Sequence, residues 1–245
     1  GDMAATRSPA TRRHRRGSLC PEEILAVGLQ LLESDGADNL TMLRVAEAMS
    51  RPVTSIYWHY RTKDELLQAL TEHVTRLVFA ELPPGDRTRP WTDNLYDHFV
   101  AYRRAMLDSP SFLRLFASRA HSLYASDAIG EILTVRLEAG LTIICAAGIP
   151  PPEALRIYTA CSSYTRGYTT LELDFRSEAH AEAADAHARR RHLSLDHDQF
   201  PLAAQLPDIA GILNYDDAQF SYGLRGLIDG LAARAAPATE PATDP

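Results

Sequence analysis

Residues 40–67 have the sequence LTMLRVAEAMSRPVTSIYWHYRTKDELL, and this stretch decides the fold. Thr41 is a good N-cap for a first short helix that continues to Met49. Pro52 disfavours helix at the residue before it, so a tight turn follows that first helix. A second short helix begins directly after the proline and covers residues 53–60. Two short helices joined by such a turn predict a helix-turn-helix, whose second helix fits the major groove of DNA.

Apolar spacing divides both short helices into an inner and an outer side. In the first helix, four side chains are expected to face a core: Leu43, Val45, Ala46 and Met49. In the second helix, Ile56 and Tyr60 cluster, with Val53 at the edge of the stripe. One narrow stripe therefore packs inward and the rest is left for DNA. Two packed helices of an ordinary helical core are the alternative, and the clustered Tyr57, Trp58 and His59 argue against it.

Helices flank this pair on both sides. Residues 21–36, PEEILAVGLQLLESDG, combine a proline suited to a first helical turn with a terminal glycine, and predict a helix. The sequence Thr62-Lys-Asp-Glu65 has the form of a capping box and predicts a long helix to about Ala80. The Pro- and Gly-bearing segment 82–86 marks a domain boundary.

The remaining chain also favours helices, at about 91–107, 110–123, 126–147, 152–174 and 216–233. Since strand alternation is not visible, the sequence predicts an all-α protein. We expect a flexible Arg-rich arm at 1–18, a helix-turn-helix domain at 19–82, a helical ligand-binding and dimerisation domain at 90–233, and a disordered tail at 234–245. Residues 176–207 form a long polar connection.

The net charge of −7 is unevenly distributed. Residues 1–70 hold nine basic and nine acidic side chains, so residues 71–245 carry the whole excess. A whole-chain charge of this kind can hide a local DNA-binding face. The three cysteines have no CxxC spacing, and neither a secretory signal nor a membrane span is evident, so a cytoplasmic protein is expected.

These residues resemble the DNA-binding domain of the tetracycline-repressor (TetR) family. The resemblance covers about residues 19–70, and its motifs are Leu40-Thr41 through Ala46, Ser55-Ile-Tyr-Trp-His-Tyr60, Lys63 and Leu66-Leu67. It implies a homodimer that binds an operator palindrome and releases it when a small molecule enters the C-terminal domain.

The resemblance also assigns contacts to DNA. Thr41 would bind phosphate, residues 53–55 would meet base edges or the adjacent backbone, and Lys63 would grip phosphate at a helix N-terminus. The full predicted set is Thr41, Arg44, Arg51, Val53, Thr54, Ser55, Tyr57, Trp58, His59 and Lys63. The chain departs from the family at the turn, where Ser50 stands in place of the usual glycine and must avoid or tolerate a positive φ.

Two C-terminal helices resemble the pair that forms a four-helix bundle across the family's dimer axis. In the first, near 152–174, small residues are predicted to form a face: Cys161, Ser162, Ser163 and Gly167. In the second, near 216–233, apolar residues form one stripe: Phe220, Leu224, Leu227, Ile228 and Leu231. The expected partners are a second copy of the chain, operator DNA and a small-molecule effector.

A cavity for the effector needs apolar walls and a few polar anchors. Aromatic and apolar residues at 95, 99, 102, 106, 112 and 116 suit either a core or such a wall. The candidate ligand-binding residues are Phe79, His98, Tyr102, Phe116, Arg119, Leu137 and Tyr158. No cofactor is indicated.

Four histidines, His180, His187, His192 and His197, raise a metal hypothesis together with Asp185 and Asp196. Their spacings of seven, five and five do not place two side chains on one helical face, so a solvated loop is favoured. Catalytic motifs are missing from the sequence, and the expectation is that the chain is not an enzyme. A helical ligand carrier or enzyme with a structural N-terminal domain is the competing hypothesis. Within the regulator class a repressor is expected, and the sequence leaves activation open.

Overall fold

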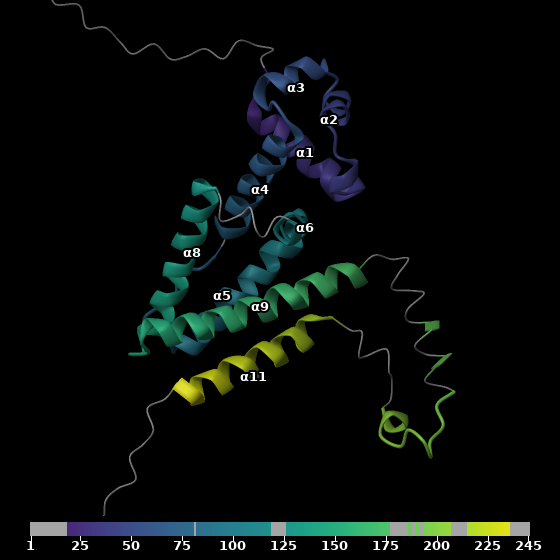
Figure 1. The fold of residues 1–245 in the computed structure, drawn as a ribbon. Coiled ribbons are helices and arrows are strands. Elements are labelled where there is room, and N and C mark those ends of the chain that lie inside the picture. The colour runs from purple at the N-terminus through teal and green to yellow at the C-terminus, as the bar shows by residue number, and fades with distance from the viewer. Residues whose placement is uncertain are drawn as a thin grey trace, which may run out of the picture. The chain divides into compact units, whose positions relative to one another are not determined.

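The computed structural model describes residues 19–80, 82–118, 126–176, 186–187, 190–191, 194–206 and 215–235. Over these residues the secondary structure is helical and contains no strand, which confirms the predicted all-α class (Figure 1). The arm at 1–18 and residues 236–245 of the tail lie outside the described residues. Contacts divide the chain into an N-terminal unit, residues 1–70, and a C-terminal unit, residues 71–245.

The N-terminal unit is built from short helices. They are α1 (Pro21–Asp35), the 3-10 turn η1 (Ala37–Asn39), α2 (Met42–Ala48), α3 (Val53–His59) and the first turns of α4 (Lys63–Ala80). Gly36 ends α1 with a φ of 80°, a conformation that glycine adopts without strain. A Cβ on Gly28 would lie 3.0 Å from the Leu70 side chain, so the missing side chain permits close packing of α1 on α4.

The inner face of α2 differs from the prediction by one residue. Val45 and Ala46 are buried as expected, but Leu43 is 55% exposed and Met42 is buried in its place. Thr41 caps the helix as predicted, since its Oγ1 accepts a hydrogen bond from the Arg44 amide at 3.1 Å. This cap fixes where α2 begins and thereby turns Met42, together with Val45 and Ala46, toward the core.

The turn between α2 and α3 is a Schellman motif. The Arg51 amide donates to the Ala46 carbonyl at 2.9 Å, and the Ser50 amide donates to Glu47 at 3.0 Å. Ser50 itself has a φ of 52°, the only positive φ of a non-glycine residue in the described chain. The turn therefore keeps the geometry that glycine usually provides, with a serine at the left-handed position.

The predicted capping box at the start of α4 forms in a shifted version. The Glu65 amide donates to Oγ1 of Thr62 at 3.1 Å, as expected. The Glu65 carboxylate accepts from the amide of Arg61 at 2.7 Å, one residue earlier than in the standard box. The helix then continues to Ala80, as the sequence predicts.

The C-terminal unit contains longer helices. They are α5 (Trp91–Asp108), α6 (Ser111–Ser118), α8 (Asp127–Cys145), α9 (Pro151–Phe175) and α11 (Asp217–Ala235), with the 3-10 turn η2 (Ala203–Gln205) before α11. α5 packs against α8, α9 and α11, and α9 also packs against α8 and α11 (Figure 1). The last helix continues two residues beyond its predicted end at 233.

An ionic network around the buried Arg103 and Glu172 joins three of these helices. The Arg103 guanidinium in α5 donates two 2.8 Å hydrogen bonds to the Glu172 carboxylate in α9 and one of 2.7 Å to Asp217 in α11. Its charged carbon also lies 4.7 Å from the centre of the Phe220 ring. Burial lowers the pKa of Arg103, but the hydrogen bonds to the two carboxylates outweigh it, and the pKa lies above its ordinary value. Arg103 therefore stays charged and fixes the packing of α5, α9 and α11.

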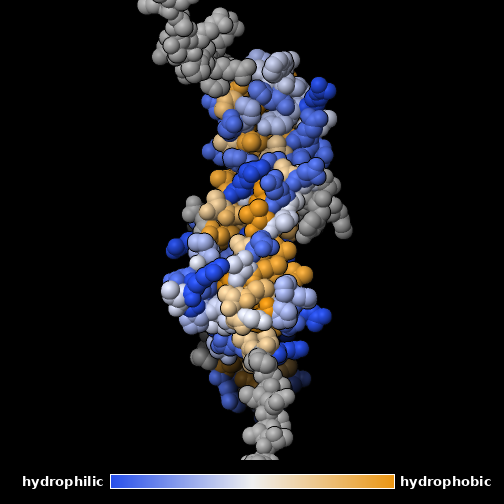
Figure 2. All heavy atoms as spheres, turned by 90° about the vertical axis from the view of Figure 1, so that its left-hand side faces the viewer, coloured by the Kyte–Doolittle hydropathy of each residue, from blue (hydrophilic) through white to orange (hydrophobic). Residues whose placement is uncertain are grey.

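The surface beside α8 is partly apolar. Val135 on this helix is 66% exposed. Figure 2, which faces the α8 side of Figure 1, shows hydrophobic side chains gathered between hydrophilic ones. None of the described helices has the length and apolar character needed to cross a lipid bilayer.

Candidate functional site

α3 presents most of its surface to solvent. Ile56 is its only fully buried side chain, and Val53 and Tyr60 flank it in intermediate positions. Trp58 is 84% exposed and Tyr57 is 48% exposed, although aromatic side chains of this size are usually covered. The short helix thus has the inner stripe and the open outer face that its sequence predicts.

The ten predicted DNA-contact residues all lie in the segment from the start of α2 to the start of α4, and none of them is buried. Several of them have partners within the unit. The Arg44 guanidinium forms an ion pair with Asp35 at the end of α1. The Trp58 and His59 rings lie edge to face with centroids 6.0 Å apart. The Thr41 hydroxyl, which accepts from an amide, still has a proton to donate.

A cavity of about 510 Å³ in the C-terminal unit brings together five of the seven predicted ligand-binding residues. We call it the Arg136 cavity. It lies between α8 and α9, and side chains from α4, α5 and α6 close it. Its walls include the predicted Phe79, Tyr102, Phe116, Leu137 and Tyr158. His98 does not line this cavity, and Arg119 lies outside the described residues.

Arg136 of α8 is the unusual residue of this cavity. It is 7% exposed, and its Nη2 has no hydrogen-bond partner in the described part of the chain. Its charged carbon lies close to three ring centres, 4.8 Å from Tyr102, 5.1 Å from Phe79 and 5.9 Å from Tyr158. Each such contact returns about 0.5–2 kcal/mol, whereas burial of an unpaired charge costs several kcal/mol. Burial accordingly lowers the pKa of Arg136, against the opposing effect of Tyr158 and Tyr102.

A glycine in α8 allows one of these rings to reach Arg136. A Cβ on Gly140 would lie 2.2 Å from Cε2 of Tyr158, so only glycine leaves room for the ring. Because Gly140 is one turn after Arg136, the ring of Tyr158 can pack along α8 and contact the guanidinium. Burial raises the pKa of the Tyr158 phenol, so its hydroxyl group stays neutral.

His98 lies on the other side of Arg136. Its Nδ1 is 3.5 Å from Nη1 of Arg136. Burial and the charge of Arg136 lower the pKa of His98 to about 3, against a smaller opposite effect of the Pro83 backbone. The imidazole is therefore neutral at physiological pH. An arginine nitrogen can only donate, so Nδ1 is the acceptor and Nε2 carries the proton.

Arg136 and a second cavity arginine, Arg166, were not predicted from the sequence. A signal for Arg136 exists, because it lies on the same face of α8 as Ile129, Gly140 and Ile143, all buried. An arginine within an apolar stripe indicates a buried charge. Arg166, in α9, is half-buried with its charged carbon 5.1 Å from the Phe116 ring centre, and its sequence neighbours carry no comparable signal.

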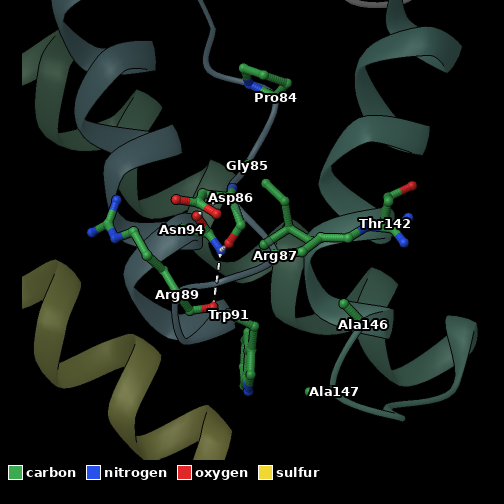
Figure 3. A pocket seen from close by; sticks show the side chains of 11 residues that line it. Pro84, Gly85, Asp86, Arg87, Arg89, Trp91, Asn94, Thr142, Ala146 and Ala147 are labelled. Atoms are coloured by element: carbon green, nitrogen blue, oxygen red, sulfur yellow. Dashed lines mark hydrogen bonds between the residues drawn. The ribbon is translucent and has the colours of Figure 1, made fainter.

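A smaller cavity of about 210 Å³ lies where the segment before α5 meets the end of α8 (Figure 3). Here Asn94, Asp86 and Arg89 are already paired. The Asn94 side chain accepts from the Asp86 amide at 2.8 Å and donates to the Asp86 carbonyl at 2.6 Å and, less closely, to the Arg89 carbonyl at 3.4 Å. Asn94 thus orders the segment before α5, and this cavity has the character of a structural turn.

In α9 and α11, the two predicted dimer helices, the buried and exposed side chains are distributed differently from the prediction. The small residues of α9 do not share a face: Cys161 is buried, Ser162 lines the Arg136 cavity, and Ser163 and Gly167 are exposed. In α11, Phe220, Leu224 and Ile228 are buried within the protomer, because they pack on α5 and α9. Leu227 and Leu231 are only partly covered. The apolar stripe of α11 is therefore mainly a core of the single chain.

The outer surfaces of these two helices are lined by small residues. A Cβ added to Gly167, Gly226 or Gly230 would meet no atom of the described chain within 4 Å. Tyr222, beside Gly226, is 79% exposed. Small side chains on a helix surface allow another helix to approach closely.

The histidine-rich connection yields no metal site in the residues that can be assessed. His180, Asp185 and His192 lie outside the described residues. Over the described ranges, no group of three or more His, Cys, Asp or Glu side chains is arranged to hold a metal ion.

Two family models match the chain. The model described as "Tetracyclin repressor-like, C-terminal domain" matches residues 83–235, and "Bacterial regulatory proteins, tetR family" matches residues 24–70. The HTH-type transcriptional repressor Rv1353c of Mycobacterium tuberculosis is 29% identical over 220 residues, which cover 89% of this chain and 82% of that protein. The tetracycline repressor protein class A of Escherichia coli is 28% identical over 221 residues, 88% of this chain and 92% of that protein.

Solved structures agree with this assignment. A possible TetR-family regulator of Streptomyces coelicolor has a TM-score of 0.67 at 26% identity, with 88% of this chain and 100% of that chain covered. The TetR-family protein ActR of S. coelicolor, solved with actinorhodin, has the same fold, with a TM-score of 0.69 at 24% identity over 89% of this chain and 99% of that chain. Both units of the chain are thus accounted for by one family. The chain belongs to the TetR family of bacterial transcription regulators.

Proposed function

We propose that this chain is a homodimeric repressor that binds a palindromic operator through α3 and releases it when a small molecule binds the C-terminal unit. Residues 19–82 would form the DNA-binding domain and residues 90–233 the ligand-binding and dimerisation domain. The open outer face of α3, with Tyr57 and Trp58 exposed beside a single buried residue, is the observation that carries the proposal.

The surroundings of α3 suit a DNA backbone. Lys63 begins α4, an 18-residue helix whose first amides favour an anion. Thr41 retains a hydroxyl proton for a second phosphate. Such contacts fix the register of a protein on the duplex, while side chains of the groove helix discriminate bases. We assign that second task to Tyr57, Trp58 and the residues at 53–55, whose side chains are exposed or only partly covered.

DNA that flanks the chain's own gene provides the test. In a gel-shift assay, Tyr57→Ala should weaken specific binding, because it removes an exposed contact without touching the core. Lys63→Ala should weaken binding to operator and random DNA alike and reduce the salt slope by about one unit. Gln30→Ala on the exposed side of α1 and Arg76→Ala in the second half of α4 serve as controls. Specific binding that neither Tyr57→Ala nor Lys63→Ala weakens would remove α3 from the interface.

Dimerisation is proposed through the outer faces of α9 and α11. Two protomers would then present their α3 helices about 34–36 Å apart, one turn of DNA. Gly226→Arg tests this interface, because the new side chain meets open space in the single chain and arginine favours helix over glycine by up to about 1 kcal/mol. Light scattering should show a folded monomer that has lost operator binding. A dimer of unchanged affinity would place the interface elsewhere.

Release by a ligand is supported by the Arg136 cavity and by a structural relative, ActR, that was solved with actinorhodin. A ligand releases DNA if it binds better to a conformer that fits the operator poorly, with a coupling of about 1–3 kcal/mol. A thermal-shift screen identifies ligands, since one at 100 times its Kd adds about 2.7 kcal/mol of stability. Addition of a hit to the protein–operator complex should lower DNA affinity about 5- to 150-fold.

A further inference from the structure

We propose that the effector is an organic anion with a flat, apolar body, and that its acidic group pairs with Arg136 inside the Arg136 cavity. That the bound anion acts as the effector rests on the proposed function, in which a ligand of the C-terminal unit releases DNA. The binding event itself is independent of DNA and is tested separately.

Among the described residues, Arg136 has no acidic partner of the kind that a buried arginine normally has. Only 7% of its surface is exposed, and its Nη2 has no hydrogen-bond partner in the described chain. The groups that act on its pKa besides burial are the neutral phenols of Tyr158 and Tyr102, and no carboxylate of the described residues is among them. A ligand carboxylate or phenolate would supply the missing charge.

The walls of the cavity indicate the rest of the ligand. Phe79, Tyr102, Phe116 and Tyr158 supply aromatic surface, and Leu133 and Leu137 supply apolar surface. The volume of about 510 Å³ is in the range of cavities that hold small organic ligands. Arg166 adds a second positive charge, and the acidic residue of the lining, Asp127, is exposed at the start of α8. Flat apolar bodies with a negative charge fit this lining best.

A neighbouring cavity of about 540 Å³ also touches Arg136, from the side of Val135 and His98. We call it the outer cavity. Its lining includes the Glu131 carboxylate, which disfavours an anion, and the single aromatic side chain Phe79 beside the His98 imidazole. Each cavity is lined by two arginines, but Arg76 of the outer cavity is already paired with Glu72. The four aromatic rings of the Arg136 cavity make it the better site for a flat anion. Variants that fill one cavity or the other distinguish the two.

The experiment uses the full chain and three matched pairs of probes: the carboxylates and carboxamides of naphthalene, biphenyl and anthracene. Within a pair the shapes agree and only the charge differs. Calorimetry should show at least one carboxylate binding tenfold or more tightly than its carboxamide. Arg136→Met should weaken that carboxylate at least about 30-fold and leave the carboxamide nearly unchanged, because loss of one partner of a buried charge pair has effects of this size. Arg136→Lys should keep part of the preference.

A purely structural arginine would behave differently. Since Arg136 has no carboxylate partner among the described residues and its ring contacts return less than its burial costs, Arg136→Met should melt at the same temperature as the wild type or a few degrees higher. Leu137→Trp, which fills the Arg136 cavity, should abolish carboxylate binding, whereas Val135→Trp at the outer cavity should leave it intact.

Three results would overturn the proposal: no carboxylate preferred over its carboxamide, a preference that survives Arg136→Met, or a clear fall in the melting temperature of Arg136→Met. Loss of binding in Val135→Trp alone would move the ligand to the outer cavity and would equally contradict it. A carboxylate that binds through Arg136 but does not alter operator affinity would confirm the site and refute release by that ligand. An inability of the chain to bind operator DNA would refute the proposed function and leave these binding results standing.

Discussion

Two arginines are buried to the same extent in the C-terminal unit, and their surroundings are opposite. Arg103 and Arg136 are 6% and 7% exposed. The first has two carboxylates, Glu172 and Asp217, within 2.8 Å, and its pKa is raised. The second has three aromatic rings and a neutral histidine, and its pKa is lowered. Burial of a charge does not by itself indicate a structural role. The partners supplied by the chain decide whether it stabilises the fold or awaits a ligand.

The largest effect is expected when Arg103 loses its buried partner, Glu172. Glu172→Ala should lower the free energy of unfolding by about 3–5 kcal/mol, because Arg103 is left buried beside only the exposed Asp217. Chemical denaturation measures it, with Glu138→Ala on the exposed surface of α8 as the control. A loss below about 1 kcal/mol would mean that the network does not hold α5, α9 and α11 together.

An effect of intermediate size is expected on the pH dependence of stability, because burial and the charge of Arg136 lower the pKa of His98. The folded state lowers the pKa of His98 from 6.5 to about 3, so the unfolded chain binds a proton first as the pH falls. The contribution of neutral His98 to stability is complete above about pH 6.5 and is lost progressively toward pH 3. At pH 5 the loss amounts to about 2 kcal/mol relative to pH 7.5.

His98→Gln removes the titrating group and should flatten this part of the pH dependence by that amount. Denaturation curves at pH 5 and pH 7.5 for both proteins give the difference. An equal change in the free energy of unfolding between pH 5 and pH 7.5 in both proteins would contradict the burial of a neutral imidazole. In Arg136→Met the pKa of His98 should rise, since one of its two lowering causes is gone, and NMR titration of the imidazole follows it directly.

The smallest effect extends the comparison to strain in the N-terminal unit. Ser50 has a φ of 52° at the left-handed position of the Schellman motif. Ser50→Gly should stabilise the chain by about 0.5–1 kcal/mol, because relief of the backbone strain exceeds the extra entropy of the unfolded glycine chain. Thermal denaturation of the two proteins tests it, with Ser34→Gly in the last turn of α1, where no positive φ occurs, expected to destabilise. A loss of stability in Ser50→Gly would show that the serine side chain stabilises the turn.

The helix-turn-helix could be predicted closely because local rules decide it. Thr41 caps α2, Pro52 ends the turn, and Ile56 is the one deeply buried position of α3, all as the spacing indicates. The error at Leu43 is of the same local kind: a short helix allows two neighbouring apolar residues, and the position of the cap selects Met42 for the core.

The C-terminal unit was predicted less completely because its faces depend on contacts between distant segments. The stripe of Phe220, Leu224 and Ile228 was correctly found to be apolar, but the sequence could not show that α5 and α9 of the same chain cover it. The apolar stripe of α8 signals that Arg136 is buried, but the rings that surround it come from α4, α5 and α9 and could not be found from spacing within α8. Five of the seven ligand-site candidates line one cavity, yet their spacing gave no indication of the arginine between them.

The most direct test of the account is a footprint on the DNA that flanks the chain's gene, made with the wild type, Tyr57→Ala and Gly226→Arg. The wild type should protect two symmetric half-sites with centres about one helical turn apart. Tyr57→Ala should need more protein for the same protection, and monomeric Gly226→Arg should give none at concentrations that saturate the wild type. Protection without two-fold symmetry, or protection unchanged by both substitutions, would contradict a dimer that reads its operator through α3.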